Sequence, residues 1–136
     1  MAEDNTVTEA KTLIRNLISQ IHNQDFTNAA TNYHDSLIII KPDGILTNKN
    51  GWINTVTNSD IRVVSNELLL WNFFELSENK DMIFCGYTTK FKFSVPNENE
   101  TFIENAIFTA LLKKYEGVWK IYYLQRTGAI INEQNP

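Results

Sequence analysis

The segment near the C-terminal end, residues 102–127, constrains the fold more than any other part of the chain. Two runs rich in β-branched and aromatic residues flank Glu116-Gly117. A two-residue connection that ends in glycine is typical of a β-hairpin, because the turn needs positive φ angles. If Tyr115 pairs with Val118, the register of both strands follows. The facing pairs on one side are then Leu112 with Ile121, Ala110 with Tyr123, Phe108 with Gln125, and Ala106 with Thr127.

The two faces of this hairpin differ in character. The first face is apolar, with small residues opposite large ones, and is predicted to line a core or a pocket. The other face carries Ile107, Thr109, Leu111, Tyr122 and Leu124. It also places Lys113 opposite Lys120, a like-charge pair that is tolerated only near water. Because apolar areas of this size usually mark partner sites, we expect a homodimer through this outer, convex face of the sheet.

Length and composition narrow the class of protein. A chain of 136 residues is expected to form one domain, residues 1–136, with a full hydrophobic core. A net charge of −4 argues against nucleic-acid binding, which needs clustered Lys or Arg. The single cysteine, Cys85, can form neither an internal disulfide nor a metal cluster, and we expect it to be buried. The chain has no signal-like start and no long apolar run, so we expect a cytoplasmic protein without membrane contacts.

The N-terminal part is predicted to be helical. Thr6 and Glu9 have the spacing of a capping box, and the apolar residues that follow repeat every three or four positions. They form one stripe of Val7, Ala10, Leu13, Ile14, Leu17, Ile18 and Ile21. Asp25 is placed to cap a second, shorter helix, and Asn48 or Asn50 to begin a third. Their apolar sides consist of Phe26, Ala29, Ala30 and Tyr33 in the second helix, and Trp52, Ile53 and Val56 in the third.

Strands are predicted for the remainder. Residues 36–41 form a short β-branched run that the Pro42-Asp43-Gly44 turn closes. Residues 61–76 and 82–95 form two long strands, and the second ends in alternating Lys and Phe, which directs Phe91 and Phe93 inward. Three helices followed by a meander of long antiparallel strands predict an α+β fold, in which the helices cover the concave face of a strongly curved sheet.

This order of elements, with the phrases IHNQDFTNAATNYHDSLIIIKPDG, NKNGWINTV and AIFTALLKKYEGVWKIYYLQR, resembles the nuclear-transport-factor-2-like superfamily and its SnoaL-like group of small bacterial proteins. The resemblance covers nearly the whole chain. It implies a cone-shaped, cystatin-like α+β fold with a mixed, mostly antiparallel sheet. It also implies a pocket between the sheet and the helices, and commonly a dimer through the outer face of the sheet.

The catalytic residues of known members do not carry over to this chain. Ketosteroid isomerases use a tyrosine where this chain has Leu17, a base where it has Ile40 or Lys41, and a second acid where it has Asn105 or Ala106. Stabilising an enolate requires preorganised donors, which these side chains lack. Scytalone dehydratases use two pocket histidines, whereas His22 and His34 are predicted at helix ends. Epoxide hydrolases of this fold use an Asp-Arg-Asp relay, and the hairpin register directs Arg126 to the outer face.

The candidate site is therefore a pocket for a small apolar ligand, with no recognisable catalytic set, no cofactor and no metal. Tyr123 and Gln125 are expected to orient the ligand at the mouth of the cone. Further candidate lining residues are Ala110, Phe108, Leu17, Trp52 and Tyr33.

Two alternatives stay open at this point. Glu67, Glu75 and Glu104 are each either a pocket acid or a solvated residue, and His34-Asp35 is either a base with its orienting carboxylate or a surface pair. The second functional hypothesis is an isomerase, dehydratase or polyketide-cyclase-type enzyme with a rearranged acid-base set. Its candidate residues are Tyr33, Asp35, Tyr123 and Gln125.

Overall fold

The structure, a computed structural model, describes residues 4–132, and side chains up to residue 128. Three α-helices precede most of the sheet: α1 (Asn5–His22), α2 (Phe26–Ala30) and α3 (Lys49–Asn58). The strands are β1 (Tyr33–Ile40), β2 (Leu46–Thr47), β3 (Arg62–Leu76), β4 (Met82–Val95), β5 (Glu100–Tyr115) and β6 (Val118–Asn132), with a short 3₁₀ turn, η1 (Pro96–Glu98), before β5. The α+β fold with a curved sheet and N-terminal helices is confirmed.

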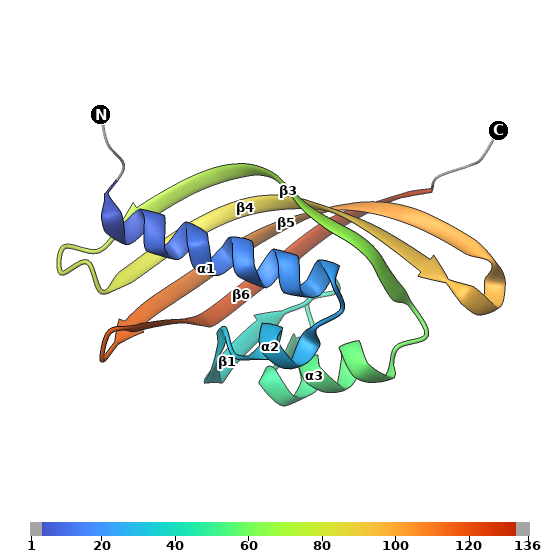
Figure 1. The fold of residues 1–136 in the computed structure, drawn as a ribbon, viewed down its shortest axis with the longest axis horizontal. Coiled ribbons are helices and arrows are strands. Elements are labelled where there is room, and N and C mark those ends of the chain that lie inside the picture. The colour runs from blue at the N-terminus through green and yellow to red at the C-terminus, as the bar shows by residue number, and fades with distance from the viewer. Residues whose placement is uncertain (1–3, 133–136) are drawn as a thin grey trace.

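One six-stranded sheet, in the order β2-β1-β6-β5-β4-β3, forms the framework. Strands β3 to β6 form the expected antiparallel meander, whereas β1 runs parallel to β6 and makes the sheet mixed. Helix α1 lies across one face of the curved sheet, and α2 and α3 lie near β1 at one edge (Figure 1). We call the face toward the helices the inner face and the opposite one the outer face.

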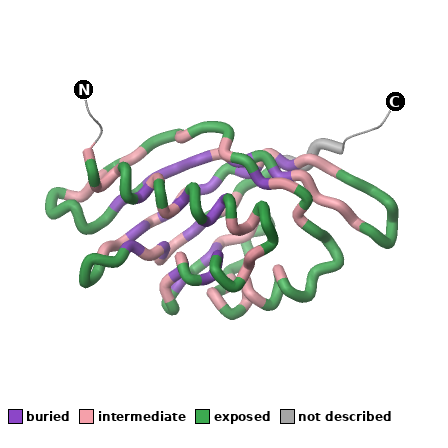
Figure 2. The backbone as a smooth tube through the Cα atoms, in the orientation of Figure 1, coloured by how far each residue is buried: buried purple, intermediate pink, exposed green. Residues whose placement is uncertain are grey.

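The hydrophobic core lies between α1 and the inner face. The apolar stripe of α1 buries Ala10, Ile14, Leu17 and Ile18. These residues meet inward side chains of the long strands, and along β5 buried residues alternate with partly buried or exposed ones. Figure 2 shows buried segments on the strands behind α1. Cys85 is buried in this core, as expected. In residues 4–132 no helix is both long and apolar enough to cross a membrane.

Helix boundaries agree with the predictions except at the first cap and the second helix. Asp4, not Thr6, caps α1, because its carboxylate accepts a hydrogen bond from the Thr6 backbone N–H at 2.8 Å. Asn48 caps α3 through the Gly51 N–H, one of the two predicted starts. Tyr33, expected on α2, instead begins β1 and pairs with Ile121 of β6, so the strand starts three residues before the predicted position.

The hairpin turn and the predicted register as far as the Leu112–Ile121 pair are confirmed, but the register beyond that pair is wrong. Glu116 and Gly117 have φ angles of 52° and 80°, and Tyr115 pairs with Val118 as expected. Between the pairs Leu112–Ile121 and Leu111–Tyr123, however, one extra residue of β6, Tyr122, has no partner on β5. This β-bulge shifts every later pair by one residue, and a shift of one residue exchanges the two faces of a strand.

Candidate functional site

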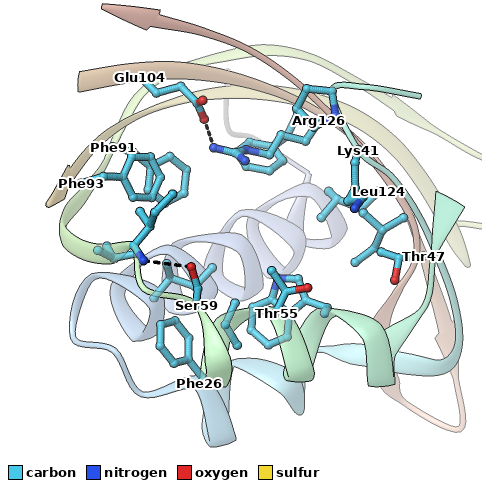
Figure 3. Close-up of a pocket in the computed structure, with 18 of the residues that line it drawn as sticks. Phe26, Lys41, Thr47, Thr55, Ser59, Phe91, Phe93, Glu104, Leu124 and Arg126 are labelled. Atoms are coloured by element: carbon cyan, nitrogen blue, oxygen red, sulfur yellow. Dashed lines mark hydrogen bonds and ion pairs between the residues drawn. The ribbon is translucent and has the colours of Figure 1, made fainter. Parts of the chain in front are cut away.

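A cavity of about 350 Å³ lies between the inner face of the sheet and the segment formed by α2, β2 and α3. Its walls are mostly aromatic and aliphatic. They comprise Ile21, Phe26, Tyr33, Ile39, Lys41, Pro42, Thr47, Trp52, Thr55, Val56, Ser59, Ile61, Val63, Phe91, Phe93, Phe102, Glu104, Phe108, Leu124 and Arg126. Figure 3 shows α3 closing one side of this space and the strands curving over the other. A concave, largely apolar cavity with few polar groups is the usual form of a small-molecule site.

The bulge at Tyr122 determines which side chains of β6 reach this cavity. Beyond the bulge, Ala110 pairs with Leu124 and Phe108 pairs with Arg126. Leu124, predicted on the outer face, is therefore buried on the inner face. Arg126, also predicted to point outward, lines the cavity instead. The correction has a simple cause, because one unpaired residue reverses the alternation that a regular strand would keep.

Tyr123 and Gln125, predicted to orient the ligand, lie on the outer face. Tyr123 pairs with Leu111 and Gln125 with Thr109, both of which face away from the helices. The Tyr123 hydroxyl donates a hydrogen bond to the Gln125 side-chain oxygen at 3.1 Å. Neither side chain lines the cavity.

The other predicted lining residues divide into two groups. Tyr33, Trp52 and Phe108 line the cavity, and the rings of Tyr33 and Trp52 meet edge to face at 4.9 Å between centroids. Leu17 and Ala110 do not line it. Both belong to the close-packed core, where Leu17 is 2% exposed and Ala110 is fully buried.

Sequence reasoning missed the most polar feature of the cavity, an ion pair between Glu104 and Arg126. The two charged groups are in contact, and their side chains are 9% and 28% exposed. Glu104 is thus the buried alternative among the three glutamates considered, whereas Glu67 and Glu75 are exposed. The guanidinium of Arg126 also lies over the Phe91 ring, 5.2 Å from its centroid, a cation–π geometry. Figure 3 shows Glu104 and Arg126 pointing toward one another across the upper wall.

Gly128 provides the space that this ion pair needs. A Cβ atom at that position would lie 2.9 Å from Cδ and 3.1 Å from Oε1 of Glu104. Gly128 pairs with Ala106 on β5, so two small residues lie side by side next to the carboxylate. Two small residues that face each other beside a glutamate indicate space for a buried carboxylate. The sequence shows this signal only when the bulge is placed correctly, because the bulge brings Gly128 opposite Ala106.

Burial changes the proton affinities of two cavity groups. Desolvation lowers the pKa of Arg126 from its usual value, because a charged guanidinium is less stable away from water. Desolvation raises the pKa of the Tyr33 hydroxyl, so that side chain stays neutral at physiological pH. The cavity therefore combines a permanent ion pair, a neutral phenol and the amine of Lys41, which lies on the same side as Leu124 and Arg126 (Figure 3).

The remaining candidate acid-base residues lie outside the cavity. Asp35 is on the surface, where its carboxylate pairs with Lys49 at 3.2 Å. The His34 ring stacks on Tyr122 at 4.0 Å, and His22 accepts a hydrogen bond from the Asn66 backbone N–H. The surface alternative for the His34-Asp35 pair is thus the one observed. Within residues 4–128, no group of three His, Cys, Asp or Glu side chains is arranged to hold a metal ion.

Comparisons with known proteins identify both a family and a fold. A family model described as a protein of unknown function, DUF3804, matches residues 5–132. None of the curated proteins matches the chain. Among solved structures, a nuclear-transport-factor-2-like protein of unknown function from Prochlorococcus is 22% identical, with a TM-score of 0.65 over 76% of this chain and 77% of that one.

Two further solved structures have the same fold at lower identity. A type 2 hexachlorocyclohexane dehydrochlorinase, LinA, is 12% identical, with a TM-score of 0.81 over 98% of this chain and 95% of that one. A protein from Novosphingobium aromaticivorans described as a scytalone dehydratase is 7% identical, with a TM-score of 0.75 over 93% and 87%. The fold of the nuclear-transport-factor-2-like superfamily is confirmed. It is shared by enzymes and by proteins of unknown function, so it does not by itself assign an activity.

Proposed function

The chain belongs to the DUF3804 family, and we propose that this member binds a small, largely apolar molecule in the cavity between its sheet and α3, without chemical turnover. The observation that carries the proposal is the cavity itself: about 350 Å³ of space bounded by side chains from α1, α2, α3 and all six strands. An apolar space of this size would fill with side chains if selection acted on stability alone, because voids lose dispersion contacts and cost free energy. We also propose that residues 1–136 form one domain, with this cavity between its sheet and its helices.

Filling the cavity tests the proposal directly. Val56 lines the cavity from α3, whereas Asn54 is exposed on the same helix and does not line it. We expect 1-decanol to bind the unmodified chain with a Kd between about 1 µM and 1 mM, the usual range for a ligand of this size. Val56→Trp should abolish this binding in calorimetric titration, and Asn54→Trp should leave it unchanged.

Comparing the two variants separates filling of the cavity from a general effect of a new tryptophan on α3. Both place an indole on α3, which contributes no fully buried residue to the core. If both variants bind decanol as the unmodified chain does, the ligand binds elsewhere and the proposed site is wrong.

A second candidate function is a cofactor-independent isomerase, dehydratase or cyclase. The observation that favours it is that one carboxylate, Glu104, and one phenol, Tyr33, line the same cavity. Of the residues first considered for this role, only Tyr33 remains, because Asp35, Tyr123 and Gln125 lie outside. We rank catalysis second because Arg126 already holds Glu104 in an ion pair, which opposes proton transfer to the carboxylate. If the unmodified chain converted a substrate, and both Glu104→Gln and Tyr33→Phe abolished that conversion, catalysis would become the favoured function.

We also propose a homodimer through the outer face, with a corrected set of residues. Leu124 no longer belongs to the proposed dimer surface, because it is buried on the inner face. Ile107, Thr109, Leu111 and Tyr122 remain outside the core, and the apolar surface continues onto β3 and β4. There, Leu70, Phe73 and Phe84 are 51%, 38% and 40% exposed. A second copy would cover the same patch on both subunits, as two-fold symmetry requires.

A charge placed on this surface tests the dimer. Ile107 is 48% exposed at the middle of the patch, and Val118 is 52% exposed at the hairpin turn, away from it. Ile107→Lys should give monomers in sedimentation equilibrium, and Val118→Lys should leave the dimer intact. A monomer before any substitution would contradict the proposal.

A further inference from the structure

We propose that the ligand class is an amphipathic monocarboxylate, whose carboxylate binds at Lys41 and Arg126 while its hydrocarbon part lies against the aromatic wall. This inference rests on the proposed binding function and narrows it to one chemistry. It starts from three charged side chains of the cavity, Lys41, Glu104 and Arg126.

The charges of these side chains do not balance. Lys41 and Arg126 contribute two positive charges, and Glu104 contributes one negative charge. Of the described residues that line the cavity, no others carry a charge. Buried or half-buried charges in apolar surroundings are normally paired, because desolvation of an unpaired ion is costly. The cavity thus has room for one additional negative charge.

The hydrogen-bond donors are likewise in excess. A guanidinium offers five N–H donors, and Glu104 engages Nη2 of Arg126. The Nε–H of Arg126 is buried and has no acceptor among the described residues. The Lys41 ammonium adds donors and has no ion-pair or hydrogen-bond partner within residues 4–128. The buried Glu104 Oε1 also lacks a hydrogen-bond partner, but it has its charge partner in Arg126 Nη2. A carboxylate is an acceptor-only group, which suits the unmet donors of Arg126 and Lys41.

The two basic residues are neighbours on the sheet because of the strand pairing. Ile40 of β1 pairs in parallel with Gln125 of β6, so the next residues, Lys41 and Arg126, are neighbours on the inner face. In Figure 3 both residues extend from the same side of the cavity, and the Arg126 guanidinium reaches along the upper wall toward Glu104, while Phe26 lies across from Lys41. A bound molecule would have its anionic end at β1 and β6 and its apolar end toward the aromatic rings. Because desolvation lowers the pKa of Arg126, a bound anion would also offset part of the cost of its burial.

The cavity volume sets the size of the ligand. At about 30 Å³ for each water-sized group, a cavity of about 350 Å³ holds roughly a dozen non-hydrogen atoms. Decanoate is a carboxylate of that size, and 1-decanol and decylamine are neutral and cationic counterparts with the same chain. The three compounds therefore separate recognition of the hydrocarbon from recognition of the charge.

The experiment is calorimetric titration of the full chain with each compound at constant ionic strength. We expect decanoate to bind about tenfold or more tightly than 1-decanol, since hydrogen bonds to charged groups are worth at least this factor. Decylamine should bind most weakly. Val56→Trp should abolish binding of decanoate, which places the carboxylate ligand in the same cavity.

Substitutions of the charged residues give effects of opposite sign. Lys41→Met should weaken decanoate binding by up to about fivefold, the range of a partly exposed ion pair, and leave 1-decanol unchanged. Glu104→Gln should strengthen decanoate binding, because it removes the carboxylate that competes for Arg126. The double variant Glu104→Gln/Arg126→Gln, which leaves no unpaired buried charge, should lose the preference for decanoate. Lys90→Met, which removes an exposed charge from the strand β4, is the control and should change nothing.

The outcomes separate the two proposals. If decanoate and 1-decanol bind equally, or if decylamine binds best, the carboxylate inference is overturned while the cavity remains a binding site. If Glu104→Gln weakens decanoate binding, Arg126 does not hold the ligand as proposed, and the inference also fails. If none of the three compounds binds, the binding function itself is refuted.

Discussion

Replacing the cavity ion pair by leucines, singly and together, tests the electrostatics of the site. The Glu104 side chain is 9% exposed and that of Arg126 is 28% exposed, so the two partners do not have equal access to water. In Arg126→Leu the Glu104 carboxylate loses its counter-ion in a nearly dry position. In Glu104→Leu the guanidinium can still turn toward solvent, as long cationic side chains do. The cost of the two substitutions should therefore differ.

The expected losses in the free energy of unfolding follow from this difference in burial. Breaking a buried pair by removing one partner costs about 3–5 kcal/mol, and we expect about 3 kcal/mol for Arg126→Leu because the pair is not fully enclosed. Glu104→Leu should cost about 1 kcal/mol, near the value of an exposed pair. The double variant should fall within about 1 kcal/mol of the unmodified chain, because two leucines replace a desolvated pair with packing. The double-mutant cycle then yields a coupling free energy of about 4 kcal/mol.

The assay is urea unfolding followed by fluorescence, with melting temperature as a second measurement. For a chain of this length a loss of 3 kcal/mol lowers the melting temperature by about 10 °C. Arg62→Leu, at an exposed position at the start of β3, controls for the removal of a positive charge. Equal losses for the two single variants, or a double variant that equals their sum, would show that the pair is solvated and that our account of the cavity is wrong.

Three further predictions concern other parts of the fold. The Trp119 indole N–H donates a hydrogen bond to the Glu9 carboxylate at 2.7 Å and holds the pKa of that carboxyl below 4.5. The stability that this hydrogen bond contributes is therefore present above pH 4.5 and is lost as the pH falls through the lowered pKa. Glu9→Gln should accordingly lower the urea midpoint at pH 7 and converge with the unmodified chain in strong acid. Gly86→Ala should cost about 1 kcal/mol in urea unfolding, because its Cβ would lie 2.5 Å from Cε1 of Phe73, and Phe73→Ala should remove this cost. Asn48→Ala removes the cap of α3 and should cost about 1 kcal/mol of thermal stability, whereas no loss would mean that the cap is dispensable.

The long elements could be predicted because each has one dominant periodicity. The apolar stripe of α1 repeats over several turns, and Phe91 and Phe93 alternate with lysines that point outward. Tertiary contacts reinforce both patterns. Tyr33 could not be assigned in this way, because its place in β1 depends on a parallel pairing with Ile121, far along the chain. Pairings between distant segments leave no local signal in either strand.

The candidate site was harder to predict because one residue decides it. Counting from the Glu116-Gly117 turn is correct as far as the Leu112–Ile121 pair, after which Tyr122 interrupts the ladder. A signal was present in the sequence: regular alternation would have buried Gln125 and exposed Leu124, the reverse of their polarity. Such a reversal within a strand indicates a bulge. With a bulge placed at Tyr122, the register would have predicted that Arg126 points inward, and Glu104 would have been the candidate for its ion-pair partner.

The bulge at Tyr122 also connects the cavity with the proposed dimer surface. By directing Leu124 and Arg126 inward, it leaves Tyr123 and Gln125 on the outer face, where they hydrogen bond to each other. The part of the outer face near β1 is therefore more polar than the strand pattern predicts. The apolar centre shifts toward β3 and β4, where the Phe73 and Phe84 rings lie 5.3 Å apart. A dimer centred there would cover the outer face of the sheet, so the cavity on the inner face would remain accessible to ligand in both subunits.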